Sequence, residues 1–487
     1  MAGTTDSNAI HNTHGWDLGL ETLEAKEQIE RQWQVDAQTQ SKPKIVARLN
    51  DWQYLERSIH RLIAAWGRSF AEWDDKIAMH RHIWEQAECV RRLRERLAQF
   101  PGSTHNAEMP VSSKLERLVN TVLLAPSHQD AVDGIYGILT GALTRSYLFY
   151  ASGAHPVHDA PTLAMLHEIV AIKEQMRLWL REYRRRHPHQ IEADYQAAIE
   201  REIRNCNDLR DALESEGEAA AAAGLNTDFR LPVVAGRPRA SRPAHDIRPF
   251  IDADFQNSVE TRRLFWAWGY MMEINLAEDQ LRWIYDAHGM PWEFLQDISR
   301  HLWDESRHGD SGHSRLVDFG ITLDEIGFGR YHPDPGDEAH DLAQRFAPMS
   351  AKELYDTVFF IGMIAETGHF AVKREAYEDF KAGGDRESAE MMLFDIIDES
   401  AHVQYAHRWL PLLAERAGID NSDYRERAVK IREEHQQKHN ESKAEKQSQL
   451  DRQSPAGKFY QELLQRMREQ QPLSNAETAP LRSPLPM

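Results

Sequence analysis

The sequence has only two cysteines among its 487 residues, Cys89 and Cys206. This scarcity excludes a disulfide scaffold and any zinc or iron–sulfur site built from several cysteines. Basic residues are also in deficit, because 58 Lys and Arg against 77 Asp and Glu give a formal net charge of −19. Nucleic acid and anionic membranes both bind basic surfaces, so we expect neither as a partner.

Long apolar runs are missing as well. No uninterrupted apolar stretch reaches the roughly 18 residues of a membrane helix. The N-terminal stretch Met1–Gly19 lacks the basic start and the apolar segment of a secretory signal, so we expect a cytoplasmic protein. Histidine, in contrast, is abundant at 24 residues. Any metal site in this chain would therefore use nitrogen and oxygen ligands.

Apolar residues recur at three- and four-residue spacing through most of the chain, and no alternating pattern of useful length appears. This periodicity predicts an all-α fold. Stretches rich in proline, glycine or charge divide the helical parts. The expected organisation is a flexible lead over 1–45, a helical bundle over 46–215, a linker over 216–257, a second bundle over 258–420 and a charged tail, partly helical and partly disordered, over 421–487.

An internal repeat relates the two halves. The five residues Arg81–Glu85 match Arg300–Asp304 at an offset of 219 positions, and weaker matches follow in chain order at offsets of 223 and 227. Ordered matches with slowly drifting offsets are typical of a duplicated helical bundle that has gained loop insertions. Chance resemblance between helices of similar composition is the alternative.

The second half carries four expected helices, over about 258–287, 291–317, 350–381 and 386–416. Three of them contain the motif Glu-x-x-His, which puts both side chains on one helix face. One such motif is usually part of a solvated face, whereas three on successive helices indicate a shared site. The three pairs are Glu305 and His308, Glu366 and His369, and Glu399 and His402.

Four carboxylates fall at one height along these helices. Glu273 and Glu305 are equally far in sequence from the expected turn at Gly289. Glu366 and Glu399 are almost equally far from the expected turn near position 383. At a rise of 1.5 Å per residue, each of the four is about 24 Å from its turn. Glu278 would lie about 7 Å from this level, so Glu273 is the preferred residue on the first helix.

Burying several carboxylates among apolar side chains is costly unless cations neutralise them, and four negative charges match two divalent ions. A buried ion-pair network without metal is the alternative. The order of the motifs resembles that of the ferritin-like di-iron and di-manganese carboxylate superfamily over roughly residues 258–416. The resemblance implies two tandem ferritin-like four-helix bundles, of which the N-terminal one is degenerate.

The resemblance also implies the cofactor and the ligand roles. The expected cofactor is two iron ions, with manganese or a mixed Mn/Fe pair as alternatives. By resemblance, Glu305 and Glu399 would bridge both metals, His308 and His402 would each bind one, and Glu273 and Glu366 would cap the pair.

Three further residues lie near this set. His369 is one turn beyond Glu366 and is interpreted equally as a third histidine ligand or as a core or supporting histidine. His301 lies on the metal face, but its repeat counterpart His82 persists in the first half, which favours a packing role. Asp395 is four residues before Glu399 and is a candidate acceptor for a hydrogen bond from a ligand histidine.

The first half lacks the metal motif. The counterparts of Glu305 and His308 are Gln86 and Cys89. We therefore expect the N-terminal bundle to serve packing, dimerisation or closure of a substrate cavity, with a second copy of the chain as a candidate partner.

These observations favour a non-haem di-iron oxidase or oxygenase that activates dioxygen to oxidise a small organic molecule. The expected partners are that substrate, dioxygen and an electron donor, which the sequence does not identify. One alternative is a di-manganese protein with catalase or peroxidase-like chemistry. Another is a non-enzymatic iron-binding or scaffold protein, which would consume no dioxygen.

Overall fold

The computed structural model describes residues 42–101, 107, 111–210, 224–232, 235–238, 243, 245–255, 257–328 and 348–470. These residues form helices and connecting segments and contain no strand, which confirms the predicted all-α class. Most of the predicted flexible lead and positions 471–487 of the predicted tail lie outside the described residues. None of the described helices combines the length and the apolar character needed to cross a membrane.

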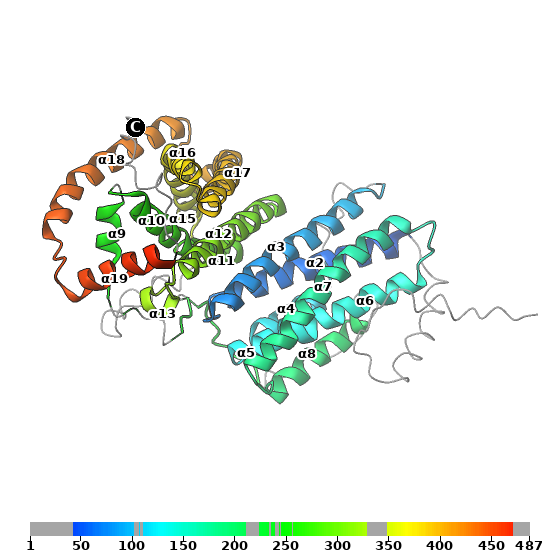
Figure 1. The fold of residues 1–487 in the computed structure, drawn as a ribbon. Helices are drawn as coiled ribbons and strands as arrows, with labels where there is room; N and C mark the ends of the chain where they lie inside the picture. Colours follow the sequence, from blue (N-terminus) through cyan, green and yellow to red (C-terminus); the bar gives the residue numbers. More distant parts are fainter. Residues whose placement is uncertain are drawn as a thin grey trace, which may run out of the picture.

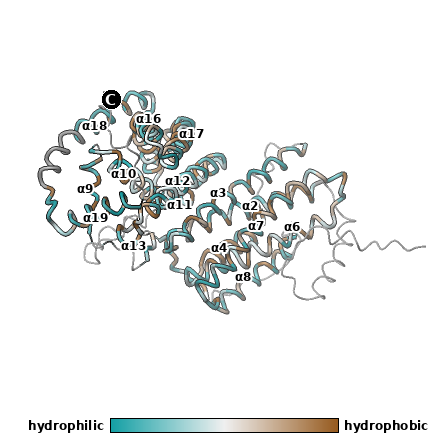
Figure 2. The backbone as a smooth tube through the Cα atoms, in the orientation of Figure 1, coloured by the Kyte–Doolittle hydropathy of each residue, from teal (hydrophilic) through white to brown (hydrophobic). Residues whose placement is uncertain are grey.

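In the N-terminal half, four long helical segments pack in a ring: α2 on α3, α3 on α7, α7 on α6, and α6 on α2. In Figure 2, apolar residues run along several of these helices. The helices are α2 (Lys42–Gly67), α3 (Trp73–Ala98), α4 (Ser113–Leu123), α5 (His128–Val132), η3 (Asp133–Leu139), α6 (Thr140–Gly153), α7 (Ala160–Arg186), α8 (Ala193–Asn205) and η4 (Asn207–Leu209).

The C-terminal half has the same order of packing. Helices α10 and α11 pack on α12, α12 on α17, α17 on α15 and α16, and α16 on α10 (Figure 1). The helices are α10 (Val259–Met271), α11 (Ile274–Asp286), α12 (Trp292–Asp318), α13 (Leu323–Ile326), α15 (Ala351–Phe359), η6 (Phe360–Ala365), α16 (Glu366–Ala382) and α17 (Arg386–Ala417).

Serine caps begin two of these helices. The Ser258 hydroxyl accepts a hydrogen bond from the backbone N–H of Thr261, and the Ser350 hydroxyl accepts one from Glu353, each at 3.1 Å. A serine side chain in this position satisfies an N–H group that has no partner within the helix. These caps fix the starts of α10 and α15.

The single helix predicted over 258–287 is interrupted. A tight turn at Met272 and Glu273 separates α10 from α11, and the Glu273 N–H donates to the carbonyl of Tyr270 at 2.8 Å. A bond to the third preceding residue tightens the backbone relative to an α-helix. The turn places Glu273 at the junction of the two helices.

Among the described residues, each half contains one π-helical segment, η3 before α6 and η6 before α16. Such segments are rare and are frequent at functional sites. Close packing explains one glycine in η6: a Cβ atom on Gly362 would lie 2.3 Å from the Cβ of Ala406 on α17. Because α16 follows η6 directly, this contact fixes where Glu366 begins α16.

The linker contains a helix that periodicity did not predict, and the tail, which we expected to be partly helical, contains two helices. Helix α9 (Arg248–Asp254) lies within the predicted linker. Beyond α17, the chain forms α18 (Tyr424–Gln449) and α19 (Pro455–Gln470), and α19 returns to the C-terminal half (Figure 1). Its buried residues share a core with residues of α10 and α12, so this part of the tail belongs to the packed interior: Tyr460, Leu463, Leu464 and Met467.

The two halves pack through corresponding hairpins, α2–α3 of one and α11–α12 of the other. Helices α3 and α12 run antiparallel. The start of α3 meets the end of α12, where the Trp73 indole donates to Asp310 at 3.0 Å. At the opposite end, Arg94 lies 3.6 Å from Glu293. The interface therefore extends along the whole length of both helices.

Candidate metal centre

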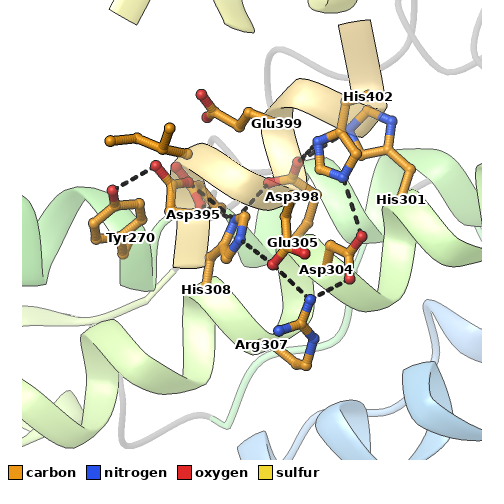
Figure 3. Close-up of polar contacts among 12 residues, drawn as sticks. Tyr270, His301, Asp304, Glu305, Arg307, His308, Asp395, Asp398, Glu399 and His402 are labelled. Carbon is orange, nitrogen blue, oxygen red and sulfur yellow. Dashed lines mark hydrogen bonds and ion pairs between the residues drawn. The ribbon is translucent and has the colours of Figure 1, made fainter. Parts of the chain in front are cut away.

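Buried histidines and carboxylates meet between α10, α11, α12, α16 and α17 in two neighbouring clusters (Figure 3). In each cluster the possible ligand atoms lie within 4.8 Å of one another. The two-histidine cluster consists of His301, Glu305, Glu366 and His402. The one-histidine cluster consists of Glu273, His308 and Asp395.

The two-histidine cluster is fully enclosed. The His301 Nε2 atom lies 2.9 Å from Glu305 Oε1 and 3.4 Å from Glu366 Oε1. The His402 Nδ1 atom lies 3.5 Å from each of the same two oxygens. The two imidazole rings stack with their centroids 3.6 Å apart. All four side chains are buried, so this cluster is closed to bulk water.

The one-histidine cluster is centred on His308. Its Nδ1 atom lies 3.1 Å from Glu273 Oε2 and 3.4 Å from Asp395 Oδ1. The second oxygen of Glu305, Oε2, lies 3.9 Å from the same nitrogen. Glu305 therefore reaches both clusters, one with each carboxylate oxygen. Glu273 is the most accessible member, with 26% of its side chain exposed.

Two aspartates hold the histidine rings in a reciprocal arrangement. His402 on α17 places Nε2 3.3 Å from Asp304 on α12, and His308 on α12 places Nε2 3.3 Å from Asp398 on α17. Arg307 bridges the two aspartates (Figure 3). A carboxylate on one imidazole nitrogen fixes the tautomer and leaves the other nitrogen available as a metal ligand. In both histidines that other nitrogen is Nδ1, which faces the clusters.

The electrostatics of the two histidines follow from these carboxylates. Burial lowers the pKa of His402, but Asp304 and Glu366 outweigh burial and raise its pKa to about 9. Burial also lowers the pKa of His308, and the nearby Asp395 and Asp398 raise that pKa well above its ordinary value. Without another cation, both rings are therefore held in the protonated form.

Several buried atoms at the centre make no well-aligned hydrogen bond, although His308 Nδ1 lies 3.1 Å from Glu273 Oε2. Buried polar groups in proteins almost always have a hydrogen-bond partner, so a concentration of atoms without one requires an explanation. A bound cation supplies one, because all of these atoms are metal-ligand types. They are Glu273 Oε2, His308 Nδ1, Asp395 Oδ1, Glu399 Oε2 and His402 Nδ1.

A buried lysine lies beside the clusters. The Lys373 Nζ atom is 2.7 Å from Asp395 Oδ2 and also pairs with Glu399. The hydroxyl of Tyr270 donates to the same Asp395 oxygen at 2.8 Å. The centre contains five carboxylates and one ammonium group: Glu273, Glu305, Glu366, Asp395, Glu399 and Lys373. With the histidines neutral, as metal ligands must be, these groups carry a formal net charge of −4, which two divalent ions would balance.

The structure brings most of the predicted residues together. Glu273, Glu305, His308, Glu366 and His402 all lie in the two clusters. His301 and Asp395, predicted only as neighbours of the ligands, are also members, and each offers a ligand atom.

Three other candidate residues belong to neither cluster. Glu399, the predicted bridge, is buried but directs one oxygen to Lys373. His369 is exposed on α16 and joins neither cluster. Glu278 pairs with Lys76 at 2.8 Å and with Arg237 at 2.7 Å, which separates it from the site.

Sequence reasoning assigned no role to Asp304 and Asp398, which orient the histidine rings, or to Lys373. A repeated motif signals the aspartates, because Asp-Glu-Ser-x-His occurs at 304–308 and again at 398–402. Lys373 lies seven residues after Glu366, two turns along the same helix face. Its spacing alone does not distinguish it from a lysine that extends into solvent.

The N-terminal half has a different cluster at its centre. Glu56, Gln86, Tyr147 and Lys173 come from α2, α3, α6 and α7, and all four are buried. The Lys173 Nζ atom lies 2.6 Å from Glu56 Oε2. Tyr147 and Gln86 also hydrogen-bond to Glu56. One carboxylate faces one ammonium group, so this cluster is electrically neutral without a metal ion.

Comparison of the chain with protein-family models, with curated proteins and with solved structures gave no match. The site is therefore assigned from its own geometry.

The metal-free protein is expected to lose stability as the pH rises from about 6.5 to about 9. The folded-state pKa of His402 is raised to about 9, so the stabilisation from its protonated ring is present below the unfolded value of about 6.5 and is lost as the pH rises through about 9. Melting temperatures across this range, with and without chelator, test this. The His402→Ala variant should show a flatter curve, and an unchanged slope in that variant would contradict the assignment.

Proposed function

We propose that this protein is a dimetal carboxylate oxidoreductase, with iron as the preferred metal and dioxygen as the oxidant. The observation that carries the proposal is the convergence of seven ligand-type side chains in two neighbouring clusters, in each of which the possible ligand atoms lie within 4.8 Å of one another. Burying this many carboxylates together is costly unless cations neutralise them.

The two clusters suggest how two ions would be held. His301, Glu305, Glu366 and His402 would hold one ion, and Glu273, His308 and Asp395 the other, with Glu305 shared between them. When bound there, two ferrous ions would supply the electrons and the open coordination positions for reduction of dioxygen.

The chain's own residues prepare the site in two ways. Asp304 and Asp398 accept hydrogen bonds from the Nε2 atoms of the two histidines and so direct each Nδ1 inward. Burial of every cluster member except Glu273 excludes water from the reacting atoms, which strengthens each electrostatic interaction there.

A small apolar pocket adjoins the two-histidine cluster and supports a role for dioxygen. It has room for about one water-sized molecule. Only a diatomic molecule is near this size, and an organic substrate would require side chains to move. Its lining residues are Trp283, Ile298, His301, Val358, Ile361, Gly362, His402, Tyr405, Ala406 and Trp409.

The helix packing supports the proposal that the chain is a tandem pair of ferritin-like four-helix bundles. In each half the four long segments contact one another in the same cyclic order. A π-helical segment precedes the third long helix in both halves. The neutral pair of Glu56 and Lys173 agrees with an N-terminal bundle that no longer needs metal.

The proposal is tested by loading metal-free protein anaerobically with Fe²⁺, counting bound iron and then measuring dioxygen consumption. We expect about two ions per chain and consumption that depends on the bound iron. In the double variant Glu305→Ala/His402→Ala, fewer than about one ion should remain and consumption should cease.

Two outcomes would contradict this function. Binding of two ions without dioxygen consumption, alone or with added reductants and small organic molecules, would favour a non-enzymatic iron-binding role. Rapid disproportionation of hydrogen peroxide by the manganese-loaded protein, with an inert iron form, would favour the catalase-like alternative.

A further inference from the structure

Lys373 is a cation already present within the proposed dimetal centre. Its side chain is only 2% exposed, and its ammonium group pairs with Asp395 and Glu399. It also lies 5.5 Å from the centre of the Tyr270 ring. A lysine is almost never fully buried unless it is paired, so the neighbouring carboxylates hold this ammonium group in place.

The pairing affects the two clusters unequally. Neither carboxylate of the two-histidine cluster, Glu305 or Glu366, is within ion-pair distance of Lys373. In the one-histidine cluster, Asp395 directs Oδ2 to Lys373 and Tyr270, which leaves only Oδ1 for an ion. The one-histidine cluster thus has fewer histidines, one carboxylate already engaged and a positive charge beside it.

We infer that the two metal positions differ in affinity, that the two-histidine cluster fills first, and that the ammonium group of Lys373 weakens binding of the second ion. This inference rests on the proposed dimetal centre and adds the order of loading and the residue that sets it. Before the second ion binds, Lys373 neutralises Asp395 and Glu399. When the second ion arrives, it shares those carboxylates with a like charge.

Calorimetric titration of the metal-free, full-length protein with Mn²⁺ measures the two steps directly. For the wild type we expect two binding events whose dissociation constants differ at least tenfold. In Lys373→Met, which removes the charge and keeps an unbranched side chain, the second ion should bind at least tenfold more tightly, so that the two steps converge. Lys373→Arg keeps the charge and should retain the separation.

Lys173→Met is the matched control, because Lys173 is equally buried and pairs with Glu56 in the other half. It should leave both Mn²⁺ steps unchanged. The positions are distinguished by single variants: His402→Ala should abolish the tighter step, and His308→Ala should abolish the weaker step and preserve the tighter one.

The outcomes separate the inference from the function on which it rests. If the wild type binds no Mn²⁺ or Fe²⁺, the dimetal centre itself is contradicted. If it binds two ions in steps of equal affinity, or if Lys373→Met leaves the separation unchanged, the centre stands and the role of Lys373 is overturned. Loss of the second ion in Lys373→Met would also overturn it, provided circular dichroism shows that the variant is folded.

Discussion

Loading with Mn²⁺ or Fe²⁺ is expected to raise the melting temperature of this protein by about 10 °C or more. At a free-metal concentration of 100 times the dissociation constant, each ion stabilises the folded state by about 2.7 kcal/mol. A folding unit of roughly 150–250 residues, the size class of the C-terminal half, shifts by roughly 2–4 °C per kcal/mol. The physical source is neutralisation of buried carboxylates: burial, together with repulsion from neighbouring carboxylates, raises the pKa of Glu273 and of Glu399 in the metal-free protein. Differential scanning calorimetry with metal and with chelator measures the shift.

The variant Glu305→Ala/His402→Ala should lose this metal-dependent shift. Its metal-free form should melt below the wild-type metal-free form near neutral pH, because the stabilisation from the protonated His402 ring is lost. The matched control is Gln86→Ala, at the repeat counterpart of Glu305, where the glutamine is buried and donates to Glu56. That control should melt lower with and without metal and should retain the full shift. An equal shift in wild type and double variant would mean that the ions bind elsewhere.

Substitution of Glu278 by alanine is expected to destabilise the protein by about 3–5 kcal/mol, because it leaves buried cations without their carboxylate. Lys76 on α3 is fully buried, and Arg237 forms two hydrogen bonds of 2.7 Å with the Glu278 carboxylate. Burial raises the pKa of Glu278, but these two cations outweigh it and lower the pKa to about 2. Glu278 lies on α11, so it ties the C-terminal half to the N-terminal half.

Urea denaturation followed by circular dichroism measures this loss. The neighbouring Asp279 is the control: it pairs with Arg68 at 2.6 Å, but 38% of its side chain is exposed. Asp279→Ala should cost less than about 1 kcal/mol. Metal content should be unchanged in both variants. A reduced metal count in Glu278→Ala would place Glu278, and not Glu273, at the centre.

Periodicity predicted some helices closely and missed others. Helices α12 and α17 begin and end within about one residue of the predicted bounds, because each is long and presents one continuous apolar face to the core. The turn at Met272 and Glu273 was missed because neither residue is glycine or proline, and the break depends on packing. Helix α19 was assigned to a tail because its partners on α10 and α12 lie far away in sequence.

Among the site residues, too, spacing predicted some positions correctly and others not. Heights along antiparallel helices brought Glu273, Glu305 and Glu366 to one level, since rise per residue is a property of the helix alone. The direction of a side chain depends also on neighbouring helices: Glu399 pairs with Lys373 from the helix beside it. His369 has the same three-residue spacing as the other histidines, but its position on α16 leaves it exposed. Spacing therefore identifies candidates, and the contacts between helices choose among them.

The antiparallel crossing of α3 and α12 has a symmetry of its own. Arg94 on α3 faces Glu293 on α12. The repeat pairs Arg94 with His313 and Glu293 with Asp74, and the negative charge of Asp74 is close enough to His313, across the same interface, to favour its protonated form. The two contacts thus join corresponding positions in reciprocal order, as contacts do in the isologous interface of a homodimer. On the proposed duplication, this contact is a dimer interface enclosed within one polypeptide. Identical subunits must change together, whereas two linked copies are free to diverge. One gene can then keep carboxylates and histidines in one copy while a lysine and a glutamate neutralise each other in the second.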